Sequence, residues 1–168
     1  LSVDQYQASG VYLLNDVRLS DKAGNSVYYC RSPWGSEKQL STTLLSRKLT
    51  VTGSTPDTTP PVLKDLTLSA SKITAPGSLT VTMTATDNLS GVDSGHAFFY
   101  CEDLDDYISC YIRKESDGKF RGTLSVDQYQ ASGVYLLNEV QLSDKAGNSV
   151  YYYRSPWGSE KQLPSSLL

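Results

Sequence analysis

The sequence predicts an all-β chain built from tandem repeats of a β-sandwich. The forty residues Leu1–Leu40 return at Leu124–Leu163 with three changes, which gives a period of 123 residues. Near-identity over such a period indicates recently duplicated whole domains. Segments of alternating apolar and polar residues also recur at the short, even spacing of a sandwich. Tyr, Thr, Ser and Gly are plentiful, which favours strands and turns over helices. The three changes are Asp16 to Glu139, Arg18 to Gln141 and Cys30 to Tyr153.

Residues 1–53 are predicted to be the C-terminal part of one incomplete repeat. In the first predicted strand, residues 11–19, one face is consistently apolar, but Asn15 interrupts this face. It is followed by a turn in which Gly24 can take a positive φ and neighbouring Asp and Asn side chains can cap the backbone. The predicted strands of this part are residues 11–19, 27–30 and 48–52.

Residues 54–61 are predicted to be a stiff, extended linker, because they contain three prolines and no apolar side chain. A second repeat then follows over residues 62–168. No strand equivalent to 48–52 occurs in it, so we expect it to lack its last strand. We also expect residues 1–53 to need sheet partners from another chain or a neighbouring copy. The predicted strands of the second repeat are residues 62–69, 79–85, 96–101, 107–113, 119–126, 134–142 and 150–153, with a polar loop at 87–95.

The composition argues against several classes of function. The net charge is −3 over 168 residues, whereas a nucleic-acid-binding protein needs a basic face. No run of about 18 apolar residues is present, so no segment is expected to cross a membrane. His96 is the only histidine, which excludes zinc sites with several histidine ligands and restricts any Ser–His–Asp arrangement to this residue. Because His96 precedes the apolar run Ala97–Tyr100, we interpret it as a strand-start residue.

Three motifs resemble the recurring signatures of bacterial immunoglobulin-like repeats in large secreted surface and adhesin proteins. They are PDTTPP at 56–61, TDNLSGV at 86–92 and SDKAGNS at 143–149. The resemblance implies Greek-key immunoglobulin-like sandwiches in a tandem array at the bacterial cell surface. It also implies a structural role, as a rigid stalk or as a filament formed by domain stacking and strand pairing. The expected partners are neighbouring repeats and other copies joined by strand complementation.

The same resemblance implies a calcium site. In an immunoglobulin-like sandwich, Asp57, Asp87 and Asp144 would share one pole at the interdomain junction, and some related repeats bind calcium there. Calcium takes six to eight oxygen ligands, including carboxylates and carbonyls. Asn88, Asp93 and Asn148 are possible additional ligands. The alternative is that each aspartate only caps its own turn.

The sequence also suggests a disulfide. A two-residue hairpin loop at Asp105–Asp106 would place Cys101 directly opposite Cys110, where side chains lie closest. A secreted setting would permit a bridge there, and Cys30 would then be a free thiol or an intermolecular link. The alternatives are two reduced thiols or a longer loop that changes the register.

Two further clusters of residues are candidate sites. The acids of Glu102–Asp106 could in principle hydrolyse glycosides, but four acids at a hairpin tip are more often a solvated charge cluster, and we expect no enzyme. The aromatic residues could form a sugar-stacking platform, which gives the alternative function of a carbohydrate-binding accessory module, or they could pack on the sheets. They are Tyr28, Tyr29, Trp34, Tyr151, Tyr152 and Trp157.

Overall fold

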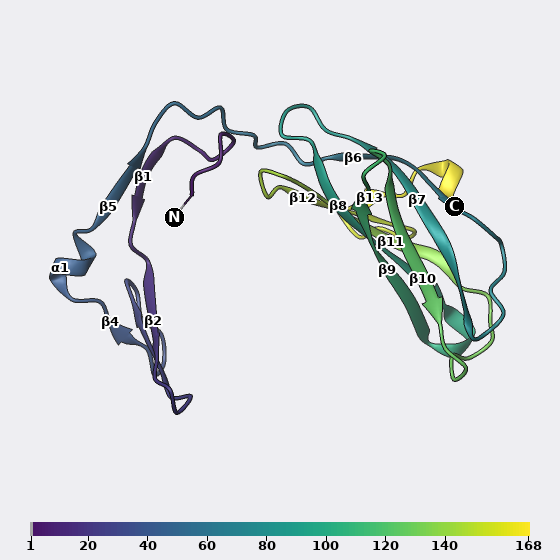
Figure 1. The fold of residues 1–168 in the computed structure, drawn as a ribbon, viewed down its shortest axis with the longest axis horizontal. Helices are drawn as coiled ribbons and strands as arrows, with labels where there is room; N and C mark the ends of the chain where they lie inside the picture. Colours follow the sequence, from purple (N-terminus) through teal and green to yellow (C-terminus); the bar gives the residue numbers. More distant parts are fainter. Residues whose placement is uncertain (1) are drawn as a thin grey trace. The chain divides into compact units, whose positions relative to one another are not determined.

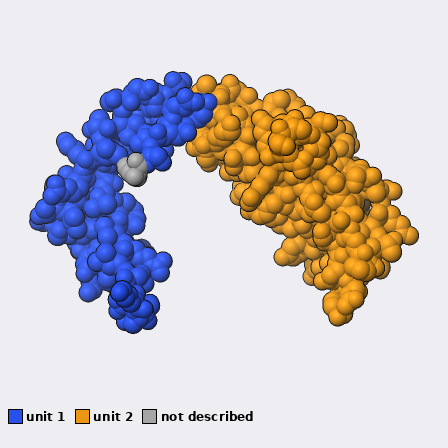
Figure 2. Space-filling view, in the orientation of Figure 1, with its two compact units in different colours: residues 1–56 blue, residues 57–168 orange. Residues whose placement is uncertain are grey.

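The computed structural model describes residues 2–168 and divides the chain into two compact units, Leu1–Pro56 and Asp57–Leu168. Figure 2 colours these units separately, and we call them unit 1 and unit 2. Both units are built almost entirely of strands, so the predicted all-β class is confirmed. None of the helices in the described part is long and apolar enough to cross a membrane.

Unit 2 contains one continuous eight-stranded sheet (Figure 1). Its strand order is β13-β12-β11-β8-β9-β10-β7-β6, and every neighbouring pair is antiparallel except β12 with β13. Two short 3-10 helices, η1 (Glu102–Leu104) and η2 (Ser165–Leu167), complete the unit. The strands are β6 (Val62–Leu68), β7 (Gly77–Thr86), β8 (Val92–Cys101), β9 (Asp106–Lys114), β10 (Phe120–Val126), β11 (Leu136–Asp144), β12 (Ser149–Tyr153) and β13 (Lys161–Gln162).

The sheet of unit 2 folds back on itself, so that strands from its two ends share one core. Apolar residues of β6 and β7 belong to the same buried cluster as residues of β11 and β12. A hydrogen bond joins these distant strands directly, because the backbone N–H of Leu63 donates to the Tyr152 hydroxyl at 3.2 Å. In β7 the core face is formed by Leu79, Val81 and Met83, which alternate with threonines as the period-2 pattern predicts.

Strand β8 is longer than predicted, because it begins at Val92 and not at His96. The polar loop is therefore shorter, and His96 lies inside the strand. Its ring stacks on Tyr111 with centroids 4.3 Å apart, and partial burial lowers the pKa of His96. The interpretation of His96 as a strand-start residue was wrong, because the alternation of buried residues continues on its N-terminal side through Gly95.

Unit 1 contains two smaller sheets. One pairs β1 with β5, and the other has the order β2-β3-β4. The predicted strand over residues 11–19 is divided into two strands around Asn15, where the sequence showed an interruption. The elements are β1 (Gly10–Leu13), β2 (Asp16–Ser20), β3 (Ser26–Cys30), β4 (Lys38–Gln39), helix α1 (Thr42–Leu45) and β5 (Lys48–Val51).

The repeated segment has different surroundings in the two units. Leu142 of β11 has no exposed area, whereas its counterpart Leu19 in unit 1 is 55% exposed. Among the described residues of unit 1, the only buried apolar side chains are Leu40 and Val51. The strands β6 to β10 that cover Leu142 have no equivalent in unit 1. That another polypeptide supplies such partners to residues 1–53 stays a prediction.

Truncation of these two leucines should have unequal effects. We expect Leu142→Ala to lower the free energy of unfolding by about 2–5 kcal/mol, because it opens a cavity in a close-packed core. Leu19→Ala removes a side chain that is already largely exposed and should change it by less than about 1 kcal/mol. Urea unfolding followed by circular dichroism measures both. Equal losses in the two variants would contradict the assignment of the core to unit 2.

Candidate metal centre

Three aspartates from distant parts of the sequence meet within unit 2. Asp57 precedes β6, Asp87 directly follows β7, and Asp144 ends β11. One carboxylate oxygen from each lies within 4.8 Å of the other two. Asp57 and Asp144 are buried, with 7% and 3% of their surface exposed, and Asp87 is partly buried. The structure therefore brings together the three carboxylates that the sequence singled out.

The Asp57 carboxylate accepts hydrogen bonds from two segments of the chain, the residues that directly follow it and the loop after β7. Its Oδ1 accepts hydrogen bonds from the backbone N–H and the hydroxyl of Thr59, both at 3.0 Å. Its Oδ2 accepts from the backbone N–H of Ser90 at 2.9 Å. These donors, Thr59 first, lower the pKa of Asp57 to about 2, so the carboxylate is ionised at neutral pH. Thr59 and Ser90 were missed by the sequence analysis, although the Asp-x-Thr spacing is typical of a local Asp turn.

Asp144 sits in a turn that forms from local contacts alone. Its two oxygens accept from the backbone N–H and the side-chain amide of Asn148, each at 2.8 Å. The same amide donates to the Asp57 carbonyl at 3.1 Å and so ties the turn to the start of the unit. In unit 1 the same turn contains Asp21, whose oxygens accept from Asn25 at 2.9 and 2.8 Å. Asp21 is exposed, so the burial of Asp144 comes from its surroundings in unit 2.

Asp87 has one oxygen with no hydrogen-bond partner. Its Oδ2 accepts from the backbone N–H groups of Leu89 and Gly91, at 3.0 and 2.8 Å. Its Oδ1 is buried and unpaired, as is the hydroxyl of Ser90. Gly91 has a φ of +86°, which glycine adopts readily and which shapes this loop. Since buried polar atoms are nearly always satisfied, an unpaired carboxylate oxygen beside two other carboxylates is an environment that a bound cation would satisfy.

The charge and the spacing of the cluster suit a divalent cation with hard oxygen ligands. The salt bridges of the described residues join Arg121 to Glu115 and Asp117, so none neutralises the three carboxylates. Calcium–oxygen distances are about 2.3–2.6 Å, which allows two ligands of one ion to be about 5 Å apart. The carboxylate oxygens of the three aspartates lie within 4.8 Å of one another, which fits this geometry. Carboxylates that accept turn hydrogen bonds retain further lone pairs, so turn capping and ion binding are compatible.

The additional ligands suggested by the sequence have different positions. Asn88 Oδ1 contacts the Thr59 hydroxyl and so lies at the edge of the cluster. Asn148 contributes hydrogen-bond donors to the carboxylates. Asp93 is exposed within β8, accepts from the Ser94 hydroxyl at 3.2 Å, and is not part of the carboxylate group. The earlier start of β8 explains why Asp93 belongs to a strand and not to the loop.

The predicted disulfide is wrong. Cys101 and Cys110 are free and buried, and Cys30 is also free. The register pairs Ala97 with Cys110 and Cys101 with Asp106, so the two thiols are about 13 Å apart along the sheet. The cause is the connection between β8 and β9, where η1 and a left-handed Asp105 (φ +48°) replace the expected two-residue loop. Burial raises the pKa of the Cys110 thiol to about 11.

The other candidate residues lie apart from the carboxylate cluster. The acids of 102–106 belong to η1 and the start of β9, where Asp105 and Asp106 accept hydrogen bonds from Tyr100 and Tyr135. Among the aromatic residues, Tyr152 is buried in the core, whereas Trp34 and Trp157 are 89% and 84% exposed. Tyr28 and Tyr151 are exposed, and Tyr29 is partly buried.

Comparisons with known proteins return no similar protein. No protein-family model, no curated protein and no solved structure matches this chain.

Replacement of Asp87 by asparagine tests the charge of the cluster. An asparagine oxygen can still accept from Leu89 and Gly91, while its amide adds a donor next to the remaining carboxylates and removes one negative charge. We therefore expect Asp87→Asn to raise the thermal midpoint by a few degrees in excess chelator. Differential scanning calorimetry measures this shift. A lower midpoint in chelator would show that repulsion between the carboxylates is not significant.

Proposed function

We propose that residues 57–168 form an immunoglobulin-like repeat that is stabilised by calcium at the end where Asp57 lies, and that it serves as a structural extender in an extracellular bacterial surface protein. The observation that supports this proposal best is the group of three carboxylates with the unpaired Asp87 Oδ1. Calcium is the preferred ion because the ligands are carboxylates, and because extracellular modules commonly use calcium at high ambient concentration.

The fold is consistent with a structural role. The strand order of unit 2 places β6, β7, β10 and β9 toward one end of the sheet and β8, β11 and β12 toward the other, which supports the proposal of a seven-strand Greek-key sandwich. Duplication of the segment Leu1–Leu40 fits a chain made of similar modules. Within this proposal the partners are neighbouring repeats and other copies, and no catalytic step is assigned.

Calcium would act by connecting three parts of unit 2 that are distant in the sequence. Asp57 begins the unit, Asp87 lies in the loop after β7, and Asp144 lies at the turn after β11. A bound ion would replace the repulsion between the carboxylates by attraction to the ion. It would also fix the position of Asp57 relative to the hairpin that β11 and β12 form. The expected result is a stiffer start to the repeat, which suits a module that must hold its neighbour at a distance.

The two copies of the SDKAGNS turn provide a matched test of calcium binding. Calcium at millimolar concentration should raise the thermal midpoint of the chain relative to chelator, because a ligand that binds only the folded state stabilises it. Asp144→Asn should abolish this rise. Asp21→Asn, in the exposed copy of the same turn, should leave it unchanged. Calorimetry with and without calcium measures all three.

Isothermal titration then checks the stoichiometry, which should be one ion for each chain. Absence of binding in the unaltered chain, or an equal loss in the Asp21 and Asp144 variants, would contradict a site in unit 2.

A second candidate function, carbohydrate binding, is favoured by the two exposed tryptophans. In unit 2 the Glu160 carboxylate accepts from the backbone N–H of Trp157 at 2.7 Å, and in unit 1 Glu37 accepts from that of Trp34 at 2.9 Å. A glycine of positive φ follows each tryptophan. The same turn thus presents a nearly fully exposed indole in both units, which is typical of a contact residue more than of a core residue.

Removal of these indoles tests the second candidate. If the chain binds a glycan, Trp157→Ala together with Trp34→Ala should weaken binding by about tenfold or more, because aromatic stacking contributes about 0.5–1.5 kcal/mol for each ring. Tyr129→Ala, which removes another strongly exposed ring, should have no effect. Glycan arrays with all three proteins provide the measurement, and an array without signal for the unaltered chain would exclude this candidate.

A further inference from the structure

The two forty-residue copies of the repeated segment differ on only one face of one hairpin. The differing pairs are Asp16 and Glu139, Arg18 and Gln141, and Cys30 and Tyr153. The first two positions are two residues apart on β2 or β11, so their side chains point to the same side of the sheet. The third position lies directly opposite the first in both ladders. In β11 the alternate residues Val140 and Leu142 are buried, so the changed residues of unit 2 face outward.

We call this surface the variable face. In unit 2 it consists of Glu139, Gln141, Tyr151 and Tyr153, and in unit 1 of Asp16, Arg18, Tyr28 and Cys30. The tyrosine that both copies share, Tyr28 or Tyr151, lies directly opposite the second changed position.

In unit 1 the variable face carries a guanidinium group on an aromatic ring. The central carbon of the Arg18 guanidinium is 5.1 Å from the centroid of the Tyr28 ring. A guanidinium is attracted to the face of an aromatic ring within about 6 Å. Asp16, two residues away on the same side of β2, adds a negative charge to this surface. Unit 1 therefore shows the kind of cation that this tyrosine position accepts.

In unit 2 the same tyrosine has no cation on its ring. Its opposite neighbour is Gln141, whose side-chain amide donates to the Tyr151 hydroxyl at 3.1 Å. The cation–ring contacts of the described part of unit 2 involve Tyr111, Phe120 and Tyr152, and none involves Tyr151. The Tyr151 side chain is exposed, so a cation from solvent can reach this ring.

The change from Cys30 to Tyr153 adds a second ring to the variable face. The rings of Tyr151 and Tyr153 are nearly parallel, with an angle of 10° between their planes and 6.3 Å between their centroids. A planar cation on one of these rings would therefore lie next to the other ring as well.

The carboxylate of the variable face lies between aromatic residues. Glu139 is directly opposite Tyr153 on one side and Phe98 of β8 on the other. Partial burial, followed by the negative charge of Glu160, raises the pKa of Glu139. The salt bridges of the described residues all involve Arg121, so none of them pairs Glu139 with a cation. A carboxylate that is partly removed from water gains from a charge-assisted hydrogen bond with a cationic partner.

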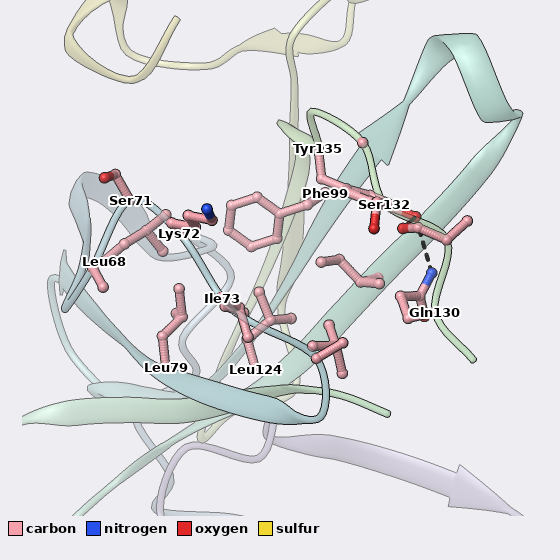
Figure 3. A pocket seen from close by; sticks show the side chains of 16 residues that line it. Leu68, Ser71, Lys72, Ile73, Leu79, Phe99, Leu124, Gln130, Ser132 and Tyr135 are labelled. Atoms are coloured by element: carbon pink, nitrogen blue, oxygen red, sulfur yellow. Dashed lines mark hydrogen bonds between the residues drawn. The ribbon is translucent and has the colours of Figure 1, made fainter. Parts of the chain in front are cut away.

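The variable face is separate from the apolar cavity of unit 2 (Figure 3). This cavity has a volume of about 300 Å³ and is lined by core residues, among them Leu79, Phe99 and Leu124. Phe98 and Phe99 are consecutive in β8, so their side chains point to opposite sides of the sheet. A ligand of the variable face therefore approaches the outer surface of the sheet, where a projecting side chain of a partner fits better than an enclosed small molecule.

We propose that the variable face of unit 2 binds the guanidinium group of an arginine side chain on a partner polypeptide. The guanidinium lies on the Tyr151 ring, in the position that Arg18 occupies over Tyr28 in unit 1, and it donates hydrogen bonds to the Glu139 carboxylate. Arginine is the matching residue because its planar group can stack on an aromatic ring and donate to a carboxylate at the same time, whereas a lysine ammonium is a compact point charge. The proposal does not rest on calcium binding or on glycan binding.

The direct test is an NMR titration of the isotope-labelled full chain with the peptide acetyl-Gly-Arg-Gly-amide. The backbone amide signals of residues 139–141 and 151–153 should shift and reach saturation. A peptide with lysine in place of arginine should bind at least about threefold more weakly, because its ammonium cannot stack. A peptide with citrulline, which keeps the planar head group but has no charge, should bind at least about tenfold more weakly. Equal affinity for the three peptides, or shifts confined to other residues, would overturn the proposal.

Variants of the chain test the position of the site. Gln141→Arg introduces the residue of unit 1, and its guanidinium should occupy the Tyr151 ring and weaken binding of the arginine peptide at least about tenfold. Glu139→Gln removes the carboxylate charge and should also weaken binding at least about tenfold. The matched control is Asp103→Asn, which removes a negative charge from an exposed position of η1 and should change the affinity by less than about twofold.

The same spectra show whether each variant is folded, and none of the three altered side chains is buried. Unchanged affinity in the Gln141 and Glu139 variants would contradict the proposal. An equal loss in the Asp103 variant would also contradict it, because the peptide would then respond to the overall negative charge of the chain and not to the variable face.

Discussion

Burial of the inner face of β11 and β12 is the interaction on which the rest of unit 2 depends. The residues of this face, Leu142 and Tyr152 among them, are in contact with strands from the opposite end of the sheet order. Without those strands the same sequence remains a hairpin with exposed leucines, as unit 1 shows. The SDKAGNS turn, the register of the two strands that it joins and the aspartate–asparagine contacts depend on local interactions and are the same in both units. The core and the carboxylate cluster are tertiary and occur only where the second layer is present.

This division explains which features could be predicted from the sequence. Alternation of apolar residues and the SDKAGNS turn depend on nearby residues, so most strands were predicted with small shifts at their ends. The exceptions are the predicted strand 11–19, which is divided in two, and β8, which begins at Val92. The convergence of Asp57, Asp87 and Asp144 could be anticipated from the resemblance to immunoglobulin-like repeats, since no local pattern links residues so far apart. Their burial and the unpaired Asp87 oxygen required the structure.

The errors arose where one residue decides the path of the backbone. Asp105 adopts a left-handed conformation after η1, and this changes the opposite partner of Cys110 from Cys101 to Ala97. Aspartate adopts the left-handed conformation more readily than most residues, but it does not always do so. A strand register that is deduced from an assumed loop length alone is therefore wrong here. In the same way, the alternation that continues through Gly95 moves Asp93 from a loop into β8.

The bridge made by the Asn148 side chain has a mechanical consequence. One amide group contacts both the backbone of the first residue of unit 2 and the carboxylate of the turn that joins β11 to β12. A pulling force that enters the unit at Asp57 would therefore reach this hairpin turn through a side-chain contact, in parallel with the path through β6. Because the force is divided between two paths, β6 would separate from the sheet later. The hydrogen bonds of the Asn148 side chain, and not those of the edge strand, would then be the weakest contacts along the path of the force.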